Sequence, residues 1–128
     1  MIKRRPVIGI VDDDVSFREA LADLVESFGF PAVSFSSAQD FLLATCAAHL
    51  QCLITDVQMP GMDGLELQAY LNASGRNLPI VFVTGYPDPQ VKVRALKAGA
   101  VGLLAKPFET DDLLRHLMTA LNIAFPSA

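Results

Sequence analysis

The sequence predicts an α/β protein with one doubly wound, five-stranded parallel sheet covered by five helices. Apolar runs rich in β-branched residues, typical of strands buried on both faces, alternate with stretches whose apolar residues recur at helical spacing. Of the 128 residues, 52% are hydrophobic and 19% are charged, which argues against disorder. This length suits one hydrophobic core, so we expect a single domain over residues 1–128.

The first half of the chain is expected to hold three strands and two helices. The strands are expected at 7–11, 32–35 and 52–56. The first helix begins with a capping box at Ser16–Glu19 and ends at Gly29. Its inward face is expected to consist of Phe17, Leu21, Leu24, Val25 and Phe28. The second helix covers residues 37 to about 48.

The second half is expected to hold two strands and three helices. The strands are expected at 80–83 and 101–105. The third helix starts with a capping box at Asp63–Glu66 and ends at Ser74-Gly75; the fourth starts at Asp88-Pro89 and ends at Gly99; the fifth starts near Thr110. The residues of the third helix expected to face inward are Leu65, Ala69 and Leu71.

The second strand is short and more polar than the others, which favours a position at an edge of the sheet. Of the two common orders of doubly wound sheets, 2-1-3-4-5 places that strand at an edge. In such sheets, ligands bind outside the carboxyl ends of the strands. We therefore expect the functional side chains among the residues that end each strand.

Charge and composition exclude several functions. With 10 Lys and Arg against 14 Asp and Glu, the net charge is -4, so direct binding of nucleic acid is not expected. No apolar run approaches a membrane span, and no signal peptide precedes the first strand, so we expect a cytoplasmic protein. Cys46 and Cys52 lack a metal-ligand spacing; both are expected as free thiols, in the second helix and in a buried strand.

Four of the predicted strands end in polar residues, which the fold brings to one edge of the sheet. These residues are Asp12-Asp13, Asp56, Thr84 and Lys106. Each alone has an ordinary explanation, because Asp often caps helices, Thr is common in strands and Lys is usually solvated. Together they predict a site.

The residue types at this site indicate phosphoryl transfer. Carboxylates crowded together repel one another unless a cation offsets them, and Mg²⁺ binds through one or two carboxylates while keeping room for phosphate oxygens. A Lys ammonium and a Thr hydroxyl suit the remaining phosphoryl oxygens. We therefore expect a magnesium-assisted phosphoryl-transfer site in which one carboxylate is the nucleophile.

With this set of motifs the sequence resembles the response-regulator receiver domains of two-component signalling, whose fold is CheY-like, or flavodoxin-like. The resemblance covers Val-Asp-Asp-Asp at 11–14, Asp56 followed by Met-Pro-Gly-Met-Asp-Gly at 59–64, Thr84-Gly85 and Lys106-Pro107-Phe108. Thr84 and Lys106 follow Asp56 by 28 and 50 residues, close to the family's usual separations. The Thr-Gly pair and the run at 97–101 are most similar to the nitrogen-fixation, FixJ-like branch.

The resemblance implies a role for each site residue. Asp56 would be the phosphoacceptor, Asp13 a direct Mg²⁺ ligand and Asp12 a ligand mainly through a metal-bound water, while the carbonyl of Gln58 would complete the protein's share of the coordination. On activation, Thr84 would move towards the phosphoryl group, and Lys106 would pair with that group. The site residues implied by the resemblance are therefore Asp12, Asp13, Asp56, Gln58, Thr84 and Lys106. The family also implies a cis peptide bond before Pro107, and it makes Asp14 a helix cap rather than a ligand.

The resemblance further implies partners and output. A sensor histidine kinase or histidine phosphotransfer protein would donate to Asp56, and the domain would catalyse only its own phosphorylation and dephosphorylation. A downstream protein would bind the face that carries Leu103, and the chain would be a monomer or a phosphorylation-dependent dimer. Leu103 stands where the family usually has Tyr or Phe, whose inward swing accompanies the Thr movement. Whether Leu103 supports this coupling stays open.

Two other functions remain open. Asp12-Asp13-Asp14-Val15-Ser16 superficially fits the Asp-x-Asp-x-Thr motif of haloacid-dehalogenase-type phosphatases, in which Asp12 would be the nucleophile. The chain lacks that family's later acidic motif and its substrate cap. A domain with the receiver fold could also act as an adaptor without using phosphate, and Leu103 is the residue that favours this alternative.

Overall fold

The computed structural model describes residues 6–44 and 49–122. The strands are β1 (Ile8–Val11), β2 (Ala32–Phe35), β3 (Cys52–Asp56), β4 (Ile80–Thr84) and β5 (Gly102–Ala105). The helices are α1 (Val15–Ser27), α2 (Ala38–Leu43), α3 (Gly64–Ala73), α4 (Pro89–Lys97) and α5 (Thr110–Ala120). The alternation of strand and helix predicted from the sequence is therefore confirmed.

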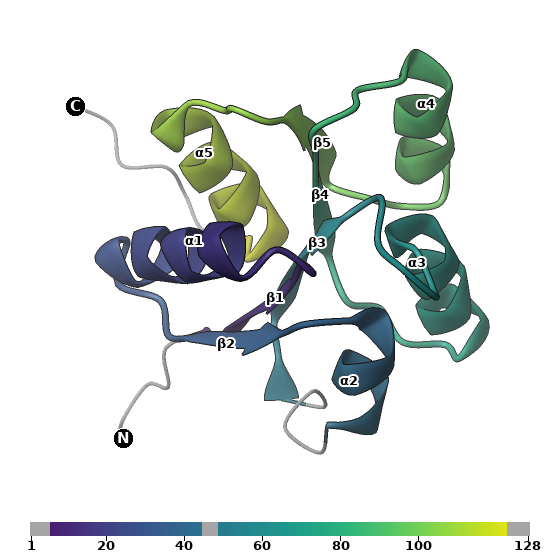
Figure 1. Ribbon diagram of the computed structural model, residues 1–128, viewed down its shortest axis with the longest axis horizontal. Helices are drawn as coiled ribbons and strands as arrows, with labels where there is room; N and C mark the ends of the chain where they lie inside the picture. The colour runs from purple at the N-terminus through teal and green to yellow at the C-terminus, as the bar shows by residue number, and fades with distance from the viewer. Residues whose placement is uncertain (1–5, 45–48, 123–128) are drawn as a thin grey trace.

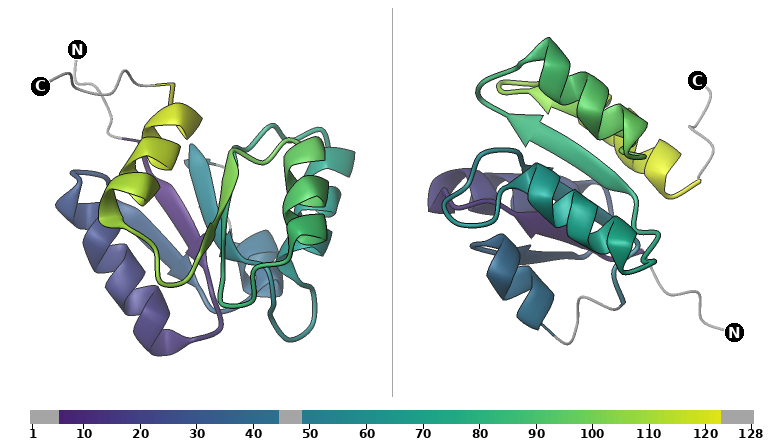
Figure 2. Two further views of the ribbon diagram at one scale, coloured as in Figure 1. Left: turned by 90° about the horizontal axis from the view of Figure 1, so that it is seen from above. Right: turned by 90° about the vertical axis from the view of Figure 1, so that its right-hand side faces the viewer.

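The strands form one five-stranded sheet in the order β2-β1-β3-β4-β5, and every neighbouring pair is parallel. Both the order and the edge position of β2 agree with the prediction. Figure 1 shows α1 and α5 on one face of the sheet and α2, α3 and α4 on the other. The two turned views in Figure 2 show the same three-layer arrangement from other sides. All five strands point the same way, so their carboxyl ends share one edge.

Alternate strand residues pack into two cores, one on each face. On the α1 and α5 side, the core includes Ile8, Ile10, Ile54, Val81, Val83, Leu113 and Leu117. On the other side, it includes Leu53, Phe82, Phe41, Leu67 and Leu71. The three central strands are buried along their whole length. This burial explains the unbroken apolar runs in the sequence.

Two helix ends differ from the prediction. Asp14 caps α1: its backbone is extended and its side chain accepts the N–H of Phe17 (3.1 Å), so Ser16 lies inside the helix and the expected capping box at Ser16 is wrong. The cap also agrees with the role that the resemblance gave Asp14. Helix α2 ends at Leu43 because Ala44 is extended, short of the expected end. The expected helical position of Cys46 lies outside the described residues.

The start of α3 agrees with the prediction, and its inward face agrees only in part. Asp63 and Glu66 form the expected capping box. Leu67 and Leu71 are the apolar residues that α3 buries fully, whereas Ala69 is exposed and Leu65 is only partly buried. The expected inward position is therefore confirmed for Leu71, holds only in part for Leu65, which packs against the core, and is wrong for Ala69.

Two further expectations concern membranes and thiols. None of the helices in residues 6–44 and 49–122 has the length and apolar character needed to cross a membrane. Cys52 is a buried free cysteine in β3, as expected. Burial raises the pKa of its thiol to about 12. The thiol is therefore protonated at neutral pH and acts as a small core residue.

Candidate functional site

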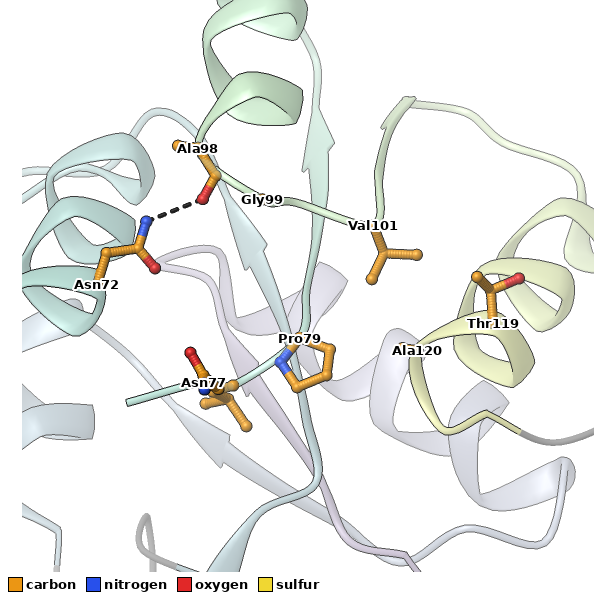
Figure 3. A pocket seen from close by; sticks show the side chains of 9 residues that line it. Asn72, Asn77, Pro79, Ala98, Gly99, Val101, Thr119 and Ala120 are labelled. Atoms are coloured by element: carbon orange, nitrogen blue, oxygen red, sulfur yellow. Dashed lines mark hydrogen bonds between the residues drawn. The ribbon is translucent and has the colours of Figure 1, made fainter. Parts of the chain in front are cut away.

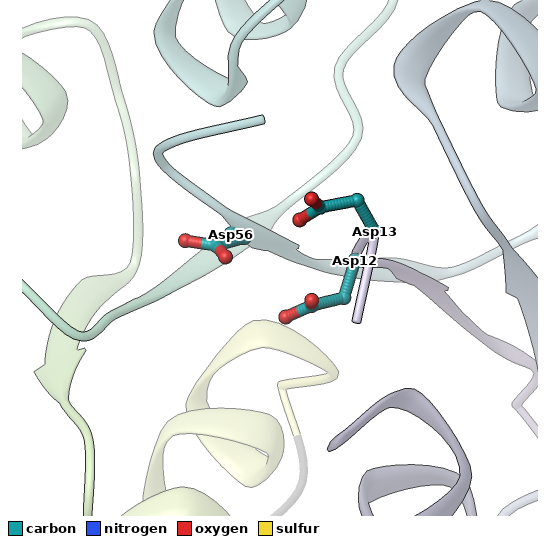
Figure 4. Close-up of side chains that lie close together, drawn as sticks. All are labelled: Asp12, Asp13 and Asp56. Carbon is teal, nitrogen blue, oxygen red and sulfur yellow. The ribbon is translucent and has the colours of Figure 1, made fainter. Parts of the chain in front are cut away.

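Three carboxylates meet at the carboxyl ends of β1 and β3. Val11, the last residue of β1, pairs with Thr55, so Asp12 and Asp56 follow side by side. One carboxylate oxygen each from Asp12, Asp13 and Asp56 lies within 4.8 Å of the others. Figure 4 shows Asp12 and Asp13 turned towards the space beside Asp56. The acidic cluster expected from the sequence is present.

The two central carboxylates are buried and held by backbone N–H groups. Asp12 is fully buried, and its Oδ1 accepts the N–H of Asp14 at 2.9 Å. Asp56 is 8% exposed, and its Oδ1 accepts the N–H of Gln58 at 3.2 Å. In each case the N–H donor lies two residues after the aspartate, so the chain turns back on the carboxylate. This leaves Asp56 with its carboxylate at an open edge of the sheet.

Lys106 links the two carboxylates. Its Nζ lies 3.1 Å from Asp12 Oδ2 and 3.3 Å from Asp56 Oδ2. The residue directly follows β5, and its backbone N–H donates to the carbonyl of Thr84 at 2.7 Å. The peptide bond between Lys106 and Pro107 is cis, as the resemblance implied. A residue 50 positions from Asp56 thus reaches the same point in space.

Thr84 ends β4 beside this cluster. Val83 pairs with Asp56 across β3 and β4, so Thr84 is the next residue along on the neighbouring strand. Its side chain is almost fully buried, and its Oγ1 accepts the N–H of Tyr86 at 3.0 Å. Because the oxygen accepts in this contact, the hydroxyl hydrogen can be donated to a ligand.

All the expected site residues therefore lie at one edge. Those that contact one another directly are Asp12, Asp56 and Lys106. Gln58 reaches Asp56 through its backbone N–H. Its carbonyl as a metal ligand stays a prediction.

The environment shifts the titration of Asp56. Burial raises the pKa of its carboxyl above the usual range; the Lys106 ammonium opposes this, and the Asp12 carboxylate reinforces it. The cluster holds three carboxylates and the Lys106 ammonium pairs with two of them, so negative charge remains in excess. A cation bound there would offset that excess.

The donor set fits Mg²⁺. The cluster offers carboxylate oxygens, the ligands that this hard cation prefers, and it contains no sulfur or imidazole ligand. Asp13 is exposed, which leaves one side of the cluster open to water or a phosphate oxygen. Such a partly open, oxygen-only arrangement suits a metal that keeps several non-protein ligands.

Gly64 packs directly against the backbone of Asp56. Its N–H donates to the carbonyl of Val57 at 2.8 Å. A Cβ atom at Gly64 would lie 2.2 Å from the carbonyl oxygen of Asp56 and 3.1 Å from the Phe82 ring. The turn after β3 can therefore close against Asp56 only because residue 64 has no side chain.

Sequence reasoning missed two residues that contact the site. Arg18 Nη1 donates to the carbonyl of Asp12 at 2.6 Å, and the Phe17 ring lies under Lys106. Phe17 was expected only as a core residue. The signal in the sequence was the short link from Asp12 to α1, which places the first turn of that helix beside the strand ends.

A larger pocket lies away from these carboxylates. It measures about 430 Å³ and is lined by Asn72, Asn77, Leu78, Pro79, Ala98, Gly99, Val101, Thr119 and Ala120. Figure 3 shows it near the start of β4, with Asn72 donating to the carbonyl of Ala98 at 2.9 Å. No ionisable side chain lines it. It therefore does not offer the chemistry found at the strand ends.

Comparison with known proteins shows which family the chain resembles in sequence. Residues 8–118 match the family model described as "Response regulator receiver domain". The chain is 44% identical over 124 residues to response regulator protein TmoT of Ectopseudomonas mendocina, covering 97% of this chain and 56% of that protein. It is 40% identical over 121 residues to transcriptional regulatory protein FixJ of Bradyrhizobium diazoefficiens, covering 94% of this chain and 59% of that one.

Comparison with solved structures agrees with the match to the family model. The crystal structure of FixJ-N superimposes with a TM-score of 0.83 at 32% identity, covering 98% of this chain and all of that one. The chain spans little more than half the length of the curated relatives it matches.

Proposed function

The chain belongs to the response regulator receiver domain family, and on this premise we propose that Asp56 accepts a phosphoryl group from a phosphohistidine. The donor would be a sensor histidine kinase or a histidine phosphotransfer protein. Since ATP charges such donors, we place the exchange in the cytoplasm. The observation that carries the proposal is Lys106, whose Nζ contacts both Asp12 and Asp56 at the open edge of the sheet.

In the reaction, an oxygen of the Asp56 carboxylate attacks phosphorus, an O–P bond forms and the P–N bond to the donor imidazole breaks. The ring nitrogen released from phosphorus takes up a proton from solvent, so the donor imidazole leaves as the neutral base. Lys106 then moves from the carboxylate to a phosphoryl oxygen, and the Thr84 hydroxyl donates to another. In hydrolysis, water attacks the same phosphorus, the O–P bond to Asp56 breaks, and inorganic phosphate leaves while the Asp56 carboxylate is restored.

Mg²⁺ is the cation we propose for the carboxylate cluster. Asp12, Asp13 and Asp56, with the carbonyl of Gln58, would hold it, Asp12 mainly through water. When bound, it neutralises charge on the phosphoryl oxygens. The protein itself orients the reacting groups. Backbone N–H groups orient the Asp12 and Asp56 carboxylates, and the position of Lys106 at the end of β5 orients its side chain.

The phosphatase alternative fits the geometry poorly. Its nucleophile would be Asp12, which is fully buried and already accepts bonds at both oxygens, from Asp14 N–H and from Lys106. The family match supports the receiver instead. Turnover of a phosphomonoester that Asp12→Asn abolishes and Asp56→Asn preserves would revive the phosphatase.

Labelling tests the phosphoacceptor. The protein is incubated with Mg²⁺ and acetyl phosphate, and we expect an acid-stable, base-labile adduct that is lost in Asp56→Asn and without Mg²⁺. Asp88→Asn is the matched control, because Asp88 is an exposed N-cap outside the acidic cluster, and it should label like the parent. Persistence of the label in Asp56→Asn would exclude Asp56 as acceptor.

For output, we propose that phosphorylation alters the face bearing Leu103, which recruits a downstream protein or a second receiver. Beryllofluoride, which mimics the phosphoryl group, provides the test. Sedimentation of the protein with and without it distinguishes a monomer from a phosphorylation-dependent dimer. If a partner binds equally well in both states, the adaptor alternative holds.

A further inference from the structure

Lys106 has a third neighbour besides the two carboxylates. Its Nζ lies 3.9 Å from the centroid of the Phe17 ring. The face of an aromatic ring carries negative potential and attracts an ammonium group within about 6 Å. The Lys106 side chain is 21% exposed, so water screens this attraction only in part.

The Phe17 ring is itself fixed. Phe108, two residues after Lys106, meets it edge-on, with centroids 6.3 Å apart and planes at 90°. The backbone N–H of Phe17 donates to Asp14 Oδ1 at the cap of α1. Both rings also pack against the core on the α1 and α5 face. The ring is therefore a rigid surface on which the ammonium rests.

The other two neighbours of Lys106 have a second task. Asp12 and Asp56 pair with Lys106 here, and they are also the carboxylates that would bind the metal. A hard cation takes oxygen ligands, and a phenyl ring offers none. The ring is thus the neighbour of Lys106 for which the metal does not compete.

We propose that Phe17 is a positioning residue for Lys106: the ring face keeps the ammonium at the phosphoryl site when the carboxylates turn to the metal. The inference rests on the proposed role of Lys106 towards the phosphoryl group. Phe17 touches neither substrate nor metal and acts through Lys106.

NMR of the Lys106 side chain tests the contact without phosphorylation. Ring current from Phe17 shifts the Lys106 ε-methylene protons upfield in the parent, and Phe17→Leu, which keeps apolar bulk without a ring, removes the shift. In the parent we expect the shift to persist in saturating Mg²⁺. Loss of the shift on adding Mg²⁺, or its survival in Phe17→Leu, would overturn the inference.

Graded fluorination separates positioning from packing. Fluorine substituted site-specifically on Phe17 weakens the potential of the ring face while nearly keeping its shape. We expect the rate of labelling by acetyl phosphate to fall stepwise with fluorine number, reaching about two- to fivefold for the fully fluorinated ring. The matched control is Phe41, whose ring lies 5.7 Å from the Arg76 guanidinium and edge-on to Phe35, with no contact to the carboxylate cluster among the described residues.

A flat rate series at Phe17, or an equal fall at Phe41, would show that the ring only packs, and the inference would fail. These outcomes are distinct from failure of the proposed function. If Asp56→Asn kept the label, the phosphoacceptor would be wrong, while the Lys106 shift in metal-free protein would still report the ring contact.

Discussion

The carboxylate end of the sheet and the α4 region are held together in different ways. At the carboxylate end, Asp12, Asp56 and Lys106 are tied to one another and to backbone N–H groups. In the α4 region, by contrast, Ala95 is the one fully buried residue of α4, and Val93 and Leu96 are 50% and 42% exposed.

Side-chain hydrogen bonds from α3 supplement the limited apolar packing of α4, in which Ala95 and Val91 contact the core. Gln68 and Asn72 of α3 donate to the carbonyls of Ala95 and Ala98, at 3.0 and 2.9 Å. An apolar pocket of about 250 Å³ lies between the start of α4 and Leu103, lined by Pro87, Asp88, Pro89, Lys92 and Leu103. The candidate phosphoryl site therefore lies in a rigid part of the protein. The α4 surface, which is the one best able to change conformation, lies in a loosely packed part.

The largest effect is expected at the rigid end, from Gly64→Ala. The added Cβ would meet backbone at Asp56, which cannot swing away as a flexible side chain would. We expect a loss of about 3 kcal/mol or more in the free energy of unfolding, measured by urea denaturation. Gly85→Ala is the control, because a Cβ there meets no atom within 4 Å among the described residues and the backbone φ is not left-handed. Equal destabilisation by both variants would contradict this account of the turn.

A smaller effect is expected where α3 holds α4. Gln68 is 3% exposed, and Gln68→Met keeps an unbranched side chain while removing the bond to the Ala95 carbonyl. That carbonyl still accepts the N–H of Ala100, so we expect a loss of only about 1 kcal/mol, together with faster amide exchange along α4.

Asn72→Ala, which removes the exposed bond to Ala98, should cost less than Gln68→Met. If exchange in α4 stays as slow in Gln68→Met as in the parent, the amide bonds do not hold this helix and the comparison of the two regions fails.

The contrast also explains what the sequence could predict. In the sequence, each of Asp12, Asp56, Thr84 and Lys106 stands at the end of a predicted strand. A parallel sheet brings all carboxyl ends to one edge, so the topology alone predicts that these residues form one site. The cap of α1 did not follow, because both Asp14 and Ser16 suit that role and the backbone conformation decides between them.

Side-chain contacts across elements were harder to predict than topology. In α3, Leu65, Leu67 and Leu71 could each face inward, and packing in the core on that side buries the last two fully and Leu65 only in part. The contact between Phe17 and Lys106 joins residues from opposite ends of the chain, and only the folded sheet reveals it.

The charge at the rigid end predicts a pH dependence of stability. Burial raises the folded-state pKa of Asp56 above 3.8, so the folded protein holds that proton more tightly than the unfolded chain does. This contribution to stability is present below pH 3.8 and is lost as the pH rises through the folded pKa. Asp56→Asn, which cannot ionise, should therefore be more stable than the parent at pH 7 without Mg²⁺.

Urea midpoints across a pH series measure this difference. The gap between Asp56→Asn and the parent should shrink as the pH falls towards 3.8, and Mg²⁺ should narrow it at pH 7 by stabilising the parent. A gap that widens on acidification would show that Lys106, rather than burial, dominates the pKa of Asp56.

The sharpest test of the comparison comes from Leu103→Phe, whose main effect is expected on coupling and not on stability. The side chain of Leu103 is 8% exposed and borders the apolar pocket under α4, so a larger ring has space to enter. We expect a change of less than about 1.5 kcal/mol in the free energy of unfolding.

The main effect of Leu103→Phe should be on the coupling between the Asp56 site and α4, because a ring that occupies this pocket must move with α4, whereas Leu103 leaves the pocket unfilled. Beryllofluoride should therefore produce larger amide shifts along α4 in Leu103→Phe than in the parent, with equal shifts around Asp56 in both. Equally large α4 shifts in the parent would mean that Leu103 already transmits the signal and that loose packing, without an aromatic ring, is enough to couple the two regions.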